Sequence, residues 1–119
     1  MRENGMLIKQ QDIENMLIEL GAPVNLKGFA YMVEAIQQYQ PGMFITKELY
    51  PQIAKTFQTT ASRVERAIRW IIGHIFDRND PEDIYRIFGN TPSRRNRMLT
   101  NAEFISLVKF RLEQRCQTG

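Results

Sequence analysis

Three arginines within seven residues, Arg63, Arg66 and Arg69, give this chain its most specific chemistry. Arginine can donate two parallel hydrogen bonds to O6 and N7 of guanine, and this is the commonest base-specific contact in the DNA major groove. Arg66 and Arg69 are three residues apart, so that on a helix they share one face and reach neighbouring base pairs. Glu65 beside them can accept from a cytosine amino group or orient an adjacent arginine. The segment 61–69 therefore has the composition of a helix that reads bases.

A helix-turn-helix is the element that would position these side chains. The first helix has apolar residues at helical spacing, with the small Ala54 where a second helix would cross: Leu49, Tyr50, Ile53 and Phe57. The break is formed by residues 58–60, in which Thr60 is the expected N-cap of the next helix. That second helix carries a stripe that we expect to be buried: Val64, Ala67, Ile68, Ile71, Ile72 and Ile75.

The opposite face of the second helix is polar at its N-terminal end. It presents Ser62, Arg66, Arg69 and Gly73, with Arg63 and Glu65 beside them. A helix with one dry face and one arginine-rich face is shaped to enter the major groove. The alternative is an ordinary amphipathic helix hairpin with a solvated basic face, and the absence of glycine from the break favours that alternative slightly.

Composition indicates a globular protein of one-domain size. The chain has 119 residues, of which 43% are hydrophobic and 24% charged, and this excludes a disordered chain. The formal net charge is only +3, so the position of the charges matters more than their sum. Acidic residues gather in 12–19 and 77–83, whereas basic residues gather in 63–69 and 94–97. This polarised distribution favours an anionic partner.

Neither a disulfide, a leader nor a membrane span is expected. Cys116 is the only cysteine, so that no internal disulfide can form, and a cytosolic setting fits. The first residues lack the apolar run of a signal peptide, and no apolar stretch approaches the length that spans a bilayer.

The periodicity predicts an all-α fold of about six helices around the helix-turn-helix, with a long recognition helix and no strand. The expected helices cover about 10–20, 26–39, 47–57, 61–77, 81–88 and 101–116. Gly21 is expected to end the first, Thr46 to cap the third, and Asp80 to cap the fifth, with Pro81 at its first position. Thr100 and Glu103 form a capping box for the last. We treat 1–119 as one domain and expect about 1–10 and 117–119 to be frayed.

The motif LYPQIAKTFQTTASRVERAIR at 49–69 resembles the C-terminal DNA-binding effector domain of the sporulation response regulator, stage-zero sporulation protein A. The resemblance extends to ELGAPVNLKGFAYMVEAI at 19–36, ITKELYP at 45–51 and TNAEFI at 100–105, and it covers about 12–112 without gaps. It implies an all-α domain of six helices that binds short promoter boxes in double-stranded DNA and activates or represses transcription in the bacterial cytoplasm, at the nucleoid.

The resemblance also implies roles for individual residues. Base contacts fall on Glu65, Arg66 and Arg69. Backbone phosphate contacts fall on Ser62 and Arg63 and on a loop that carries Arg94, Arg95 and Arg97. The surface that contacts RNA polymerase sigma factor falls within about 79–92, with these residues as candidates: Asn79, Asp83, Phe88 and Pro92. The domain is expected to be a monomer in solution or a dimer on tandem DNA sites.

The chain departs from the family at several positions. The family typically has His after the last arginine of the recognition helix, where this chain has Trp70. Trp70 can pack against the sugar–phosphate backbone, but its type favours burial in the core or at a helix crossing. The segment 79–83 is more acidic than the family pattern, which affects the polymerase contact. No stretch can form a receiver domain, so we expect an excised effector domain or a stand-alone protein without phosphorylation control.

Other functions have less support in the residues. His74 is the only histidine, has no cluster of ligands around it, and is not expected to bind a metal. Asp80, Glu82 and Asp83 fit a helix start better than acid–base chemistry, and neither an enzyme nor a cofactor site is expected. The main alternative is a receiverless homologue that acts as a protein-interaction module or modulator without specific DNA readout. RNA binding lacks the exposed aromatic residues beside basic ones that it needs.

Overall fold

The computed structural model of the chain describes residues 8–88 and 98–118, and within these ranges all regular structure is helical. In chain order it forms α2 (Gln10–Glu19), α3 (Lys27–Gln38), a π-helical turn η1 (Ile45–Leu49), α4 (Tyr50–Phe57), α5 (Ala61–Arg78), α6 (Pro81–Ile87) and α7 (Asn101–Thr118). The expectation of an all-α fold with a long recognition helix is confirmed, and each predicted helix has its counterpart.

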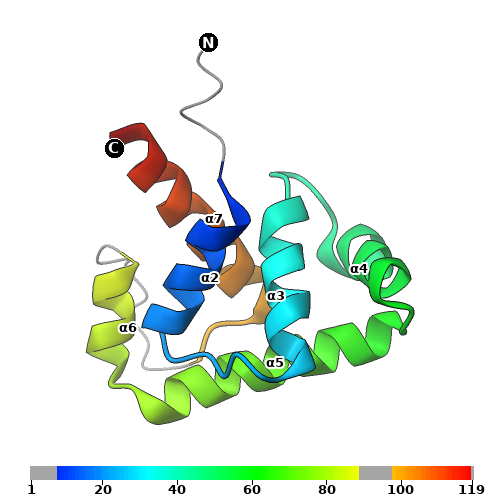
Figure 1. Cartoon of the computed structure of the whole chain (residues 1–119), viewed down its shortest axis with the longest axis horizontal. Helices are drawn as coiled ribbons and strands as arrows, with labels where there is room; N and C mark the ends of the chain where they lie inside the picture. Colours follow the sequence, from blue (N-terminus) through cyan, green and yellow to red (C-terminus); the bar gives the residue numbers. More distant parts are fainter. Residues whose placement is uncertain (1–7, 89–97, 119) are drawn as a thin grey trace.

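Helix α5 forms one edge of the molecule, and the other helices pack along it (Figure 1). Helix α4 lies at its N-terminal end, α3 crosses its middle, and α6 follows its C-terminal end. Helices α2 and α7 pack against each other and lie beside α3, on the same side of α5. The core is mainly aliphatic but also contains buried aromatic rings, and its fully buried members include Ile13, Leu17, Met32, Ile36, Ile53, Ile68, Ile72 and Phe104.

The crossing of α3 over α5 depends on a glycine. A Cβ atom at Gly28 would lie 2.8 Å from Cγ1 of Ile71 and 2.9 Å from the backbone oxygen of Ala67. These distances are shorter than van der Waals contact, and a backbone oxygen cannot rotate away as a side chain can. The absence of a side chain at Gly28 therefore sets how closely α3 approaches the middle of α5.

Two helix ends form as their sequences predict. Gly21 has φ of +90° and follows α2 in a Schellman motif, in which the amide of Ala22 donates to the oxygen of Leu17 at 2.9 Å. At the start of α7 the amide of Glu103 donates to Oγ1 of Thr100 at 3.1 Å, and the amide of Thr100 donates to Oε1 of Glu103 at 2.9 Å. This reciprocal pair is the expected capping box.

The expected start of the third helix is wrong. Thr46 does not cap a helix, because it lies inside η1, whose N-cap is Phe44; the amide of Phe44 donates to Oε1 of Glu48 at 2.9 Å. Order also begins before residue 10: Ile8 is buried in the core, and its oxygen accepts from Nε2 of Gln37 at 3.0 Å. At the other end α7 continues to Thr118. The described part of the chain therefore runs from Ile8 at one end to Thr118 at the other.

Among the described residues, no helix combines the length and the apolar composition that crossing a lipid bilayer requires.

Candidate nucleic-acid interface

Helices α4 and α5 form the predicted helix-turn-helix, with a glutamine in the conformation that usually requires glycine. Gln58 has φ of 56° and ψ of 49°, the left-handed region. The amide of Thr59 donates to the oxygen of Ala54 at 2.9 Å, and the amide of Gln58 donates to that of Lys55 at 3.3 Å, which is again a Schellman motif. The turn therefore has the geometry that glycine would give, at a cost in backbone strain at Gln58.

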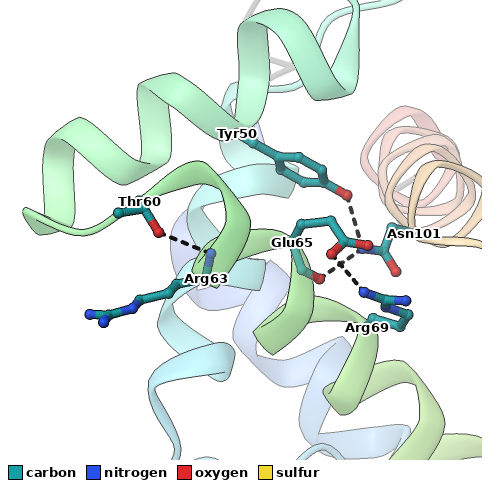
Figure 2. A network of polar contacts seen from close by, with 6 residues as sticks. All are labelled: Tyr50, Thr60, Arg63, Glu65, Arg69 and Asn101. Carbon is teal, nitrogen blue, oxygen red and sulfur yellow. Dashed lines mark hydrogen bonds and ion pairs between the residues drawn. The ribbon is translucent and has the colours of Figure 1, made fainter.

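Thr60 caps the N-terminus of α5, as predicted. Its Oγ1 accepts a hydrogen bond from the amide of Arg63 at 3.2 Å (Figure 2). This bond satisfies one of the amides that have no partner inside the helix. The cap fixes the first turn of α5, which carries Ser62 and Arg63.

The two faces of α5 divide as the sequence predicts. The buried residues are Val64, Ile68, Ile71, Ile72 and Ile75, while Ala67 at the edge of this stripe is only half-buried. Ser62, Arg63, Arg66 and Arg69 are exposed on the other side, and Glu65 is half-buried. The N-terminal half of α5 therefore presents a contiguous basic surface to solvent.

Glu65 and Arg69 form an ion pair one turn apart. Nη2 of Arg69 donates to Oε1 of Glu65 at 2.7 Å (Figure 2). Both side chains are substantially exposed, so the pair adds little to stability. Its consequence is geometric, because it directs the guanidinium of Arg69. The sequence leaves two roles open for Glu65. In the protein without DNA, Glu65 has the second role, because it orients the side chain of Arg69.

Trp70 is not buried, contrary to the expectation. Its side chain is 55% exposed, and its ring stacks on that of His74 with centroids 5.1 Å apart. The reason is the helical period of about 100° per residue, which places Trp70 on the side of α5 opposite Ile68 and Ile72. Trp70 lies one turn beyond Arg66, so that an exposed aromatic ring borders the basic surface.

Sequence reasoning did not identify Asn101 as part of this site. Nδ2 of Asn101 donates to the hydroxyl oxygen of Tyr50 at 2.9 Å and to the backbone oxygen of Glu65 at 3.1 Å (Figure 2). The only signal in the sequence was the position of Asn101 at the expected start of the last helix. The structure therefore connects the first turn of α7 to both helices of the helix-turn-helix.

The residues implied for a polymerase contact do not form one exposed surface. Nδ2 of Asn79 donates to the oxygens of Leu20 and Ile75 at 2.9 and 2.8 Å. Phe88 is buried with its ring edge against Phe104. Of the three candidates that the structure describes, only Asp83 is exposed, and its Oδ1 accepts from Arg86 at 2.8 Å. The remaining candidate, Pro92, and the loop arginines Arg94, Arg95 and Arg97 lie outside the described residues.

Among the residues that the structure describes, no group of three or more His, Cys, Asp or Glu side chains could hold a metal ion.

Comparison with known families places this helix-turn-helix in a family. Residues 13–112 match the family described as Sporulation initiation factor Spo0A C terminal. The chain belongs to this family. The match covers the whole helix-turn-helix and nearly all of the described helices. The chain is therefore a DNA-binding domain of the sporulation initiation regulators, and its family is regulatory and not enzymatic.

Proposed function

We propose that this chain binds promoter DNA in a sequence-selective manner, with the N-terminal half of α5 in the major groove. The observation that carries the proposal is the exposure of Arg66 and Arg69 on the face of α5 opposite its buried stripe. Helices of this motif place their N-terminal residues against base edges. The basic surface occupies that half of α5.

Each side chain on this surface has a role that its chemistry supports. Arg66 and Arg69 would each donate to O6 and N7 of a guanine. Glu65 would hold Arg69 through the 2.7 Å ion pair and accept from a cytosine amino group when Arg69 turns toward a base. These three residues form the base-reading set.

Contacts to phosphates would fix the register of α5 on the duplex. Ser62 and Arg63 lie in the first turn of α5, where amide groups point toward an anion. Arg94, Arg95 and Arg97 would add contacts from their loop. Trp70 would pack against the sugar–phosphate backbone beside Arg66. Contacts of this kind give affinity and salt dependence without sequence preference.

Transcription regulation in the bacterial cytoplasm is the expected outcome of this binding. The surface formed by the C-terminal end of α5 and by α6 would then contact RNA polymerase sigma factor through Asp83. On two adjacent promoter boxes, two copies of the chain would bind as a dimer.

Fluorescence anisotropy tests the proposal directly. The chain is titrated against a duplex that carries the promoter box of the family and against a scrambled duplex of equal composition, at two salt concentrations. We expect tighter binding to the box duplex, with a preference that persists when salt weakens the binding to both. Equal and salt-sensitive affinity for the two duplexes would contradict the proposal and favour a protein-interaction module that has kept the fold.

A further inference from the structure

We propose that Asn101, at the start of α7, is a positioning residue that fixes the recognition helix for base reading. The inference rests on the proposed function, because it concerns the accuracy of that DNA readout. Asn101 itself belongs to neither helix of the motif, and it acts through Tyr50 and Glu65.

The first step of the argument is the geometry of the amide. Its Nδ2 group has two hydrogens, and both are used: one points to the Tyr50 hydroxyl at 2.9 Å and the other to the Glu65 oxygen at 3.1 Å. Tyr50 is the first residue of α4, and Glu65 is in the second turn of α5. A single side chain therefore holds the two helices of the motif at a set separation.

The second step concerns what the apolar core leaves undetermined. Burial of the aliphatic stripe holds α5 against the core, but the hydrophobic effect has no direction. Hydrogen bonds do have direction. A bond to the oxygen of Glu65 resists rotation of α5 about its axis, and such a rotation would move Arg66 and Arg69 relative to the groove.

The third step connects the bridge to a reading side chain. Glu65 accepts from Asn101 through its backbone oxygen and from Arg69 through its carboxylate (Figure 2). The chain of contacts thus runs from α7 through one residue to the guanidinium of Arg69. The same four residues, Tyr50, Glu65, Arg69 and Asn101, line one surface hollow beside the basic face.

The surroundings strengthen the bridge. Tyr50 is buried, and burial raises the pKa of its hydroxyl, which therefore stays neutral at physiological pH. Asn101 is half-buried. Hydrogen bonds in such surroundings are stronger than in open water, and the loss of a partner is costly.

The test compares Asn101→Ala with Asn79→Ala. Asn79 makes an equivalent amide bridge at the other end of α5, to the oxygens of Leu20 and Ile75, and is the matched control. Tyr50→Phe is the second variant, because it keeps the buried ring and removes only one acceptor. Unfolding is followed for every protein, so that DNA titrations use conditions in which each is folded.

We expect Asn101→Ala to lower the ratio of box to scrambled affinity by about tenfold, since small displacements of reading groups are costly. The slope of affinity against salt should stay unchanged, because phosphate contacts remain. Tyr50→Phe should lower the ratio less, and Asn79→Ala should leave it unchanged although it lowers stability. An unchanged ratio in Asn101→Ala, or an equal loss in Asn79→Ala, would overturn the inference while the proposed function stands. Absence of any preference in the unaltered chain would instead overturn the proposed function, and the inference with it.

Discussion

The two ends of α5 are each connected to a distant segment by an asparagine amide but present different surfaces. Near the N-terminal end, Asn101 of α7 donates to the oxygen of Glu65. At the C-terminal end, Asn79, the C-cap residue of α5, donates to the oxygen of Leu20 after α2 and to that of Ile75 in α5 itself. The outward face of the first end carries three exposed arginines, whereas that of the second carries Asp77 and Arg78 and precedes the acidic start of α6. The scaffold therefore does not distinguish the ends. Their surface chemistry does, and it is the basis of our proposal that DNA contacts the first end.

The largest expected effect comes from the crossing of α3 over the middle of α5, between the two ends. Gly28→Ala would place a Cβ atom 2.9 Å from the oxygen of Ala67, and we expect a loss of about 2–3 kcal/mol in the free energy of unfolding. The clash should outweigh the gain in helix propensity of up to about 1 kcal/mol. Urea unfolding followed by circular dichroism measures this. A variant as stable as the parent would mean that α3 and α5 are not in such close contact.

Substitution of the arginines at the first end should weaken DNA binding and leave the stability of the fold unchanged. We expect Arg66→Ala and Arg69→Ala each to cost about 1–3 kcal/mol of binding to the box duplex and to relax the preference at one base pair. Arg78→Ala, at the second end of the same helix, removes an equal charge and is the control. If Arg78→Ala weakened binding to the box duplex as much as the other two substitutions, their effect would reflect the loss of a positive charge and not its position on α5.

Gly73 lies between the two ends of α5, and its substitution should have a smaller effect, on the free energy of unfolding. A Cβ atom there would lie 3.7 Å from Sδ of Met98, which is ordinary contact. Gly73→Ala should therefore raise the free energy of unfolding by up to about 1 kcal/mol, as thermal unfolding can measure. DNA affinity should not change. A marked loss of affinity would show that the DNA contact extends past Trp70 to this turn.

The smallest expected effect is at the turn before α5. Gln58 has φ of 56°, which glycine adopts without strain, so we expect Gln58→Gly to raise the free energy of unfolding by about 0.5–1 kcal/mol. The same anisotropy titration should give the parent's preference for the box. A destabilised variant would indicate that the glutamine side chain contributes more to the turn than its backbone strain costs.

Features that depend on neighbouring residues were predictable from the sequence. The cap at Thr60, the box of Thr100 and Glu103, the stop at Gly21 and most of the buried stripe of α5 all follow from short-range spacing. Each depends on residues within about three turns, and their types decide the outcome locally.

Features that depend on how helices meet were not predictable. Asn101 contacts residues 51 and 36 positions away, and Asn79 contacts one 59 positions away. No local pattern marks an asparagine that will bridge two elements. The close approach at Gly28 likewise depends on a crossing angle. Trp70 was misplaced because its residue type was weighed above its angular position on α5, which the helical period gives directly.

The central claim, that DNA meets the first end of α5, is tested most directly by NMR. Backbone amide chemical shifts of the labelled chain are followed while the box duplex is added. The account predicts that the largest changes fall on residues 60–70 and that those of 75–88 stay small. Largest changes in 75–88, with little change in 60–70, would contradict it.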